Sequence, residues 1–189
     1  MKKSLLTLVA IVFSAFLETV SFAQNALYWE DYSPEKQNAI ISSDSLDPLV
    51  SAYYYGEKQP SDDEDTFSFL EILASRTDQD DRRALFFHLL NRVALKADGA
   101  LAESMGYFQY RILINYPQYV FEYLCGNQEC RDCYVWNLGY ILSWNPEGEG
   151  LNKELLKMNE HVGAKIDPAL KEKWQQFMAA ILVEIENCD

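Results

Sequence analysis

The fold of this chain is decided by residues 101–144, which read LAESMGYFQYRILINYPQYVFEYLCGNQECRDCYVWNLGYILSW. Eleven of these 44 residues are aromatic, and three of the four cysteines of the chain lie among them. The apolar residues recur at helical spacing, and the spacing is interrupted at Pro117 and again at Gly126. The stretch therefore predicts three successive helices, and we expect the remaining helices to pack against this aromatic centre.

Capping residues mark where the flanking helices begin. Ser33-Pro34 and Asp47-Pro48 each place a capping side chain before a proline, which is a favoured start of a helix. Residues 61–64, Ser-Asp-Asp-Glu, have the pattern of a capping box that begins at Ser61. Residues 77–81 again place acidic side chains where the helix dipole favours them. These four sites predict four helix starts before residue 90.

The apolar residues recur at helical spacing through most of the chain, most clearly over residues 86–97, 101–116 and 170–185. No segment shows the sustained apolar–polar alternation of a half-buried strand. Helices joined by short links favour antiparallel neighbours. We therefore predict one all-α domain over residues 24–189, a bundle or short array of about eight to nine antiparallel helices.

Two details predict how particular helices face their surroundings. Gly139 lies inside a predicted helix, where glycine costs about 1 kcal/mol relative to alanine, so another helix should cross closely there. His88, Arg92 and Lys96 follow one another at intervals of four residues, so they should form the polar side of their helix.

Residues 1–23 have the pattern of a secretory signal peptide. Two lysines precede an apolar run of 13 residues, Leu5 to Leu17, and Ser21-Phe22-Ala23 supplies a cleavage site. Thirteen apolar residues are too few to span a hydrocarbon layer of ~30 Å as a helix. We predict an exported protein, periplasmic or secreted, whose mature form begins at Gln24 and does not insert into a membrane.

The four cysteines, in an exported chain, predict a domain crosslinked by two disulfides. The sequence leaves three pairings open, and the favoured one joins Cys188 to Cys130 or Cys133 and leaves Cys125 for the other bond. Closing a loop of more than about 50 residues would contribute about 4 kcal/mol in the chain-entropy model. Two alternatives are a thiol–disulfide redox pair, because Cys130 and Cys133 have its spacing, and a zinc site of four thiolates.

Charge and aromatic content point to a binding function. The formal net charge is −13, and it becomes −14 when residues 1–23 remove two lysines and one glutamate. This balance disfavours nucleic acid and anionic membranes and favours a basic protein partner. Tyr53, Tyr54 and Tyr55 are adjacent on a predicted helix, where successive side chains point about 100° apart, so at least one should be exposed. We predict that these three tyrosines form the binding face.

Catalytic signals are sparse. The two histidines, His88 and His161, lie in no nucleophile motif. Glu103-Ser104, early in an apolar helix, resembles the glutamate–serine start of the lytic transglycosylase motif, which implies a carboxylate-based hydrolase. The glycine-rich Gly-Leu-Met-Gln segment of that family is missing here, so we interpret Glu103 as a polar-face residue. No catalytic residue, cofactor site or metal site is predicted.

These observations favour an exported acidic helical protein that acts by binding, such as an inhibitor or immunity-type partner of a basic protein. Two other classes remain as alternatives. One is a small exported enzyme, either a carboxylate-based hydrolase or a thiol–disulfide redox protein, and the other is a structural accessory of an envelope assembly.

Overall fold

The structure is a computed structural model that describes residues 28–75, 80–144 and 148–188. This part of the chain contains helices and no strand, which confirms the all-α class. Two 3-10 helices and nine α-helices follow one another in the order η1 (Trp29–Asp31), α2 (Pro34–Ile41), α3 (Pro48–Tyr54), α4 (Glu64–Ala74), α5 (Asp80–Ala94), α6 (Gly99–Asn115), α7 (Pro117–Gly126), α8 (Gln128–Ser143), α9 (Gly148–Gly163), η2 (Pro168–Leu170) and α10 (Lys171–Cys188).

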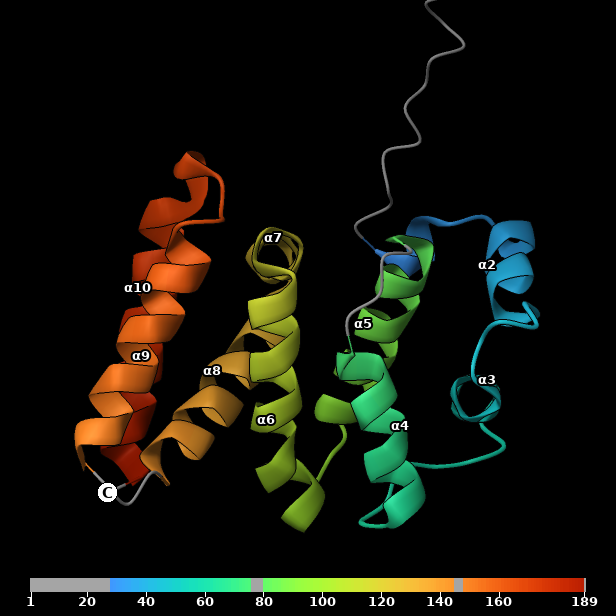
Figure 1. Ribbon diagram of the computed structural model, residues 1–189, viewed down its shortest axis with the longest axis horizontal. Coiled ribbons are helices and arrows are strands. Elements are labelled where there is room, and N and C mark those ends of the chain that lie inside the picture. The colour runs from blue at the N-terminus through green and yellow to red at the C-terminus, as the bar shows by residue number, and fades with distance from the viewer. Residues whose placement is uncertain (1–27, 76–79, 145–147, 189) are drawn as a thin grey trace, which may run out of the picture.

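The helices are laid out side by side in chain order rather than closed into a ring (Figure 1). α2 and α3 lie at one end of the longest axis, α6 lies in the middle, and α9 and α10 lie at the other end. The predicted signal peptide, residues 1–23, and the predicted mature start, Gln24, lie outside the described residues. Within the described part, none of the helices combines the length and the apolar character needed to cross a membrane.

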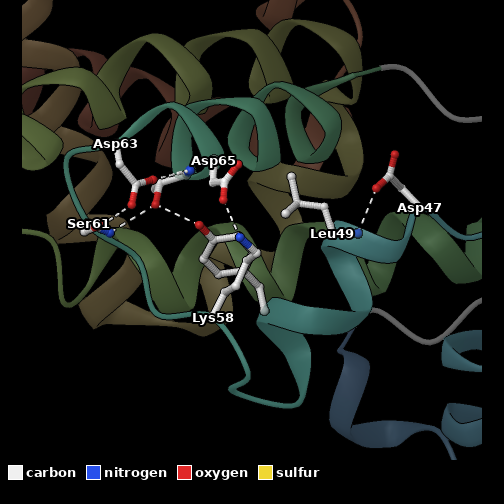
Figure 2. Close-up of polar contacts among 8 residues, drawn as sticks. Asp47, Leu49, Lys58, Ser61, Asp63 and Asp65 are labelled. Carbon is white, nitrogen blue, oxygen red and sulfur yellow. Dashed lines mark hydrogen bonds and ion pairs between the residues drawn. The ribbon is translucent and has the colours of Figure 1, made fainter.

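Local capping explains several helix starts. The Ser33 hydroxyl accepts a hydrogen bond from the Lys36 amide, and the Asp47 carboxylate accepts one of 2.8 Å from the Leu49 amide (Figure 2). The predicted start at Ser61 is wrong by two residues. Asp63 caps α4, and the Ser61 hydroxyl donates to the Asp63 carboxylate instead of capping the helix itself.

Three further boundaries follow from the structure. α5 ends at Ala94, and Gly99 opens α6 with a φ of 51°. α9 begins at Gly148. The Asp167 side chain caps η2, and α10 follows η2 at Lys171.

Helix α8 lies between α6 and α10 and makes close contacts with both. A Cβ added at Gly106 of α6 would lie 2.3 Å from the Asn137 carbonyl oxygen, and one added at Gly139 would lie 2.6 Å from the Glu184 Cβ. Both distances are shorter than van der Waals contact. The helices can therefore cross this closely only because glycine has no side chain at these two positions. The predicted close crossing at Gly139 is confirmed.

The core is aromatic where α5, α7, α8 and α10 meet. Phe87 of α5 makes edge contacts with the rings of Tyr123 and Tyr134, with centroids 4.7 and 6.3 Å away. Phe121 of α7 contacts Trp174 of α10 at 5.2 Å. Such tilted ring pairs stabilise a core beyond the area that they bury. The expected packing against residues 101–144 is found for α4, α5, α9 and α10, whereas α3 packs mainly against α4.

The predicted antiparallel arrangement does not hold for α8 and α10. Arg131, near the start of α8, lines the same pocket as Lys173, near the start of α10. Further along both helices, Gly139 lies against Glu184. The two helices therefore run in the same direction. This is possible because α9, which lies between them in the sequence, brings the chain back to the level at which α8 starts.

Candidate functional site

The four cysteines are free thiols in this structure, so the predicted crosslinks are not present in it. Cys130 is buried in the core, Cys125 and Cys133 are half-buried, and Cys188 is exposed at the end of α10. The direction of α10 explains why the favoured pairing does not form. Cys188 lies near Tyr140, which is seven residues, or about 10 Å of helix, beyond Cys133. A disulfide requires the two Cα atoms to lie within about 7 Å of each other.

The surroundings of Cys130 and Cys133 are opposite to those of a redox pair. Burial raises the pKa of the Cys130 thiol to about 11, and only 2% of the residue is exposed. Burial also raises the pKa of Cys133, although the Gln109 and Asn137 amides donate hydrogen bonds of 3.7 and 3.3 Å to its sulfur. A redox thiol needs exposure and a lowered pKa. Cys133 therefore contributes to packing between α8 and α6, and Cys130 lies beside Tyr123 of α7.

A metal centre is not formed by these side chains. No group of three or more histidine, cysteine, aspartate or glutamate side chains converges within the described residues. The zinc alternative considered for the four cysteines therefore has no ligand set in that part of the chain.

The three tyrosines predicted as a binding face point in different directions. Tyr53 is buried, stacks on Phe69 at a centroid distance of 4.0 Å, and shares a hydrogen bond of 2.8 Å with the Thr66 hydroxyl. Tyr54 is half-buried and packs edge-on against Trp29. Tyr55 is 57% exposed, as the 100° spacing required. Of the three tyrosines only Tyr55 is exposed. The predicted binding face is therefore reduced to a single ring.

A broader aromatic surface lies on α8. Trp136, Tyr140 and Trp144 follow one another at intervals of four residues, and we call them the aromatic ladder. The rings of Trp136 and Tyr140 are stacked with centroids 5.8 Å apart, and the rings of Tyr140 and Trp144 are 5.9 Å apart. Trp136 is 46% exposed and Trp144 is 71% exposed. The ladder therefore exposes its two tryptophans to solvent, with the half-buried Tyr140 between them.

The position of the ladder follows from helix geometry. The buried stripe of α8 consists of Cys130, Tyr134, Leu138 and Leu142. Each ladder residue lies two positions after a member of this stripe, and two positions turn the helix by about 200°. The ladder thus occupies the side of α8 that faces away from the core, so its rings are available for contact with another molecule.

An open groove of about 350 Å³ runs beside the ladder, between α8 and the start of α6. Trp144, Tyr140 and Ile141 line one side, and Ala100, Glu103 and Ser104 line the other. Partial burial, followed by the nearby Glu103 carboxylate, raises the pKa of Tyr140. A carboxylate therefore lies beside the middle ring of the row.

The same groove bears on the hydrolase alternative. Glu103 is the one carboxylate among the described residues that line it. Glycoside hydrolysis normally requires a pair of carboxyl groups on either side of the bond that breaks. The geometry around Glu103 therefore suits recognition of a ligand better than acid–base chemistry.

Comparison of the chain with protein-family models, curated proteins and solved structures found no match. The candidate site thus rests on the geometry of this chain. The sequence contained a signal for the aromatic ladder, namely three large aromatic residues spaced by four in a predicted helix. The prediction of the binding face instead followed the adjacent tyrosines, which are more conspicuous in the sequence but cannot share one face.

Proposed function

We propose that this protein acts by binding a basic protein, and that the aromatic ladder on α8 is the docking surface. The observation that carries the proposal is the row of three rings, in which Trp136 stacks on Tyr140 and Trp144 lies tilted against Tyr140, on the side of α8 that faces away from the core. Tryptophan and tyrosine are enriched among the anchor residues of interfaces, where each ring excludes water over a large area. The ladder therefore supplies the contacts that keep a complex together.

The charge of the chain supports a basic partner. A net charge of −13 attracts cationic proteins and repels anionic ones, which affects the rate of association more than the lifetime of the complex. Near the ladder, Glu103 is close enough to Trp144 to line the same groove. An arginine of the partner would stack on the Trp144 ring and pair with the Glu103 carboxylate, because guanidinium groups make both contacts.

We further propose that binding takes place after export, in the periplasm or outside the cell. The lysines, the apolar run and the Ser21-Phe22-Ala23 site in residues 1–23 support this location. An inhibitor or immunity-type role is consistent with it, because both act by occupying a surface of another protein. The intact mass of the exported protein should correspond to a start at Gln24, and a mass that includes residues 1–23 would contradict export by cleavage.

The docking surface is testable with a labelled hexa-arginine peptide as the probe, followed by fluorescence anisotropy. We expect binding that weakens as salt rises, because salt shortens the Debye length from about 10 Å at 0.1 M to about 3 Å at 1 M. Trp144→Ala should weaken binding roughly 2- to 30-fold, which corresponds to a cation–π contact of about 0.5–2 kcal/mol. Glu103→Gln should weaken it in the same direction.

Tyr55→Ala is the matched control, because it also removes an exposed aromatic ring and leaves the net charge unchanged. It should leave the affinity for hexa-arginine within the error of the measurement. If Tyr55→Ala weakens binding as much as Trp144→Ala does, the rings contribute only through general surface character and the ladder is not the docking surface. Binding of hexaglutamate equal to that of hexa-arginine would contradict the preference for a basic partner.

A further inference from the structure

A second concave site lies at the other half of the molecule, between the α3–α4 connection, α5 and the start of α6. It is a pocket of about 210 Å³. Its apolar lining comes from five side chains that are at most 5% exposed: Tyr53, Phe69, Leu89, Val93 and Leu101. The pocket therefore suits a small ligand with an apolar body.

The wall formed by the α3–α4 connection is fixed by hydrogen bonds (Figure 2). The Ser61 amide donates to the Thr66 hydroxyl at 3.0 Å, and that hydroxyl also bonds with the Tyr53 hydroxyl at 2.8 Å. Lys58 forms an ion pair with Asp65 across the same connection. Because these contacts already hold the wall in place, a ligand does not have to order it on binding.

The mouth of the pocket carries positive charge in a strongly acidic chain. Arg92 and Lys96 lie one helical turn apart on the α5 side and line the pocket. Neither forms an ion pair with another residue in the described part of the chain. Two carboxylates, Asp62 and Asp98, also line the pocket. This combination favours a single negative charge next to Arg92 and Lys96, because the two aspartates repel an ion that carries more.

We propose that this pocket binds a small apolar monocarboxylic acid. The carboxylate of the ligand pairs with Arg92 and Lys96, and its apolar body lies against Tyr53, Val93 and Leu101. Arginine and lysine make charge-assisted hydrogen bonds to carboxylates, and these bonds are stronger than neutral ones. The apolar lining gives the ligand a surface that replaces water. This site is separate from the aromatic ladder and does not depend on the function proposed for it.

The proposal is tested with three probes that share one body and differ in charge: phenylacetate, phenylacetamide and 2-phenylethylamine. Ligand-observed NMR at millimolar concentration measures their affinities for the full chain. We expect phenylacetate to bind most tightly, phenylacetamide more weakly and 2-phenylethylamine most weakly. Absence of phenylacetate binding, equal affinity for the acid and the amide, or tighter binding of the amine would each overturn the proposal.

Variants then locate the bound acid. Arg92→Gln and Lys96→Gln should each weaken phenylacetate binding about 3- to 10-fold, since each removes one charge-assisted contact. Neither should change the affinity for phenylacetamide. Lys157→Gln removes the same charge from an exposed lysine outside the pocket, and it should leave phenylacetate binding unchanged. An equal loss in Lys157→Gln would mean that overall charge, rather than this pocket, attracts the acid.

Ala97→Leu tests the pocket by shape instead of charge. Ala97 lines the pocket and is half-buried, so the larger side chain should occupy part of the volume. Binding of phenylacetate and phenylacetamide should then be lost together, while the circular dichroism spectrum and the melting temperature confirm that the variant is folded. Unchanged phenylacetate binding in a folded Ala97→Leu protein would place the ligand elsewhere.

Discussion

The tyrosines at positions 53–55 and the aromatic ladder of α8 each consist of two aromatic residues in a helix and a third at its C-cap, yet their environments differ. Tyr53 is part of the core, Tyr54 is half-buried and Tyr55 is exposed. In the ladder, all three rings share one side of the helix and two of them are largely exposed. The difference comes from spacing alone, because adjacent residues diverge by about 100° and residues four apart diverge by about 40°.

This comparison shows that the spacing of aromatic residues, and not their number, decides whether they form one surface. A run of adjacent rings is divided between core and solvent, so its contribution to stability is concentrated in one member. Aromatic residues spaced by four lie on the same side of a helix, and in α8 this side faces away from the core. Substitutions should therefore affect stability unequally within residues 53–55 and only slightly within the ladder.

The largest effect is expected for Tyr53→Ala. This change removes the ring stacked on Phe69 and the hydroxyl that bonds with Thr66. Replacing a large buried aromatic residue by alanine typically costs about 3–5 kcal/mol, because transfer energy is lost and a cavity remains. Chemical denaturation should show a loss near 3 kcal/mol for Tyr53→Ala. Tyr55→Ala should change the free energy of unfolding by less than about 0.5 kcal/mol, and equal losses for the two variants would contradict the division between core and surface.

The second largest loss of stability is expected at the close crossing of α6 and α8. In Gly106→Ala the new Cβ would lie 2.3 Å from the Asn137 carbonyl oxygen, which belongs to the backbone of α8 and has little freedom to move. Overpacking costs about 1–3 kcal/mol, and the higher helix propensity of alanine returns about 1 kcal/mol. A net loss of up to about 2 kcal/mol in the free energy of unfolding is expected.

Gly163→Ala is the control for this substitution. Its Cβ would meet no atom closer than the Trp174 Nε1 at 3.4 Å, which is ordinary contact. Its stability should stay the same or rise slightly. Similar losses in Gly106→Ala and Gly163→Ala would mean that close approach to α8 is not what Gly106 provides.

Local signals in the sequence were sufficient to predict most of the helices. The capping side chains of Ser33 and Asp47 and the breaks at Pro117 and Gly126 act within one turn, so they identify helix boundaries without knowledge of the fold. The boundary at Ser61 was misplaced because several consecutive side chains there are able to cap, and the structure selects Asp63.

The tertiary features were less accessible to sequence analysis. The pairing expected for Cys188 depended on whether α10 runs parallel to α8, and nothing local to either helix determines that direction. The pocket at Arg92 and Lys96 joins residues from Tyr53 to Leu101. The sequence alone indicated only that Arg92 and Lys96 lie on the polar side of their helix. The aromatic ladder, by contrast, was predictable from its spacing and was missed.

A smaller effect is expected from the titration of Cys130, on the buried stripe of α8. Burial raises the pKa of this thiol from an ordinary value near 9 to about 11. Below pH 9 the thiol is neutral in both the folded and the unfolded chain, so its contribution to stability does not change. As pH rises from about 9 to about 11, the unfolded chain loses the proton while the folded chain keeps it, and stability falls.

Denaturation curves recorded across this pH range check the prediction with two variants. Cys130→Ala should show a weaker decline in stability with pH than the wild-type chain. Cys188→Ala removes a thiol that is exposed in the folded chain, and it should keep the wild-type decline. A decline that is unchanged in Cys130→Ala would assign the effect to other groups, such as the buried tyrosines.

The smallest effect on stability is expected for Trp144→Ala, although this residue has the largest ring of any side chain near the groove. Trp144 is 71% exposed and its ring contacts Tyr140 at a tilt of 42°. Exposed substitutions away from caps and buried networks usually change stability by less than about 0.5 kcal/mol, and we expect that limit to hold in chemical denaturation. A loss of more than about 1 kcal/mol would mean that the ladder serves the fold, as Tyr53 does. A near-zero loss combined with weaker hexa-arginine binding is the outcome that separates the two aromatic groups, because a ring that contributes nothing to folding then contributes to recognition.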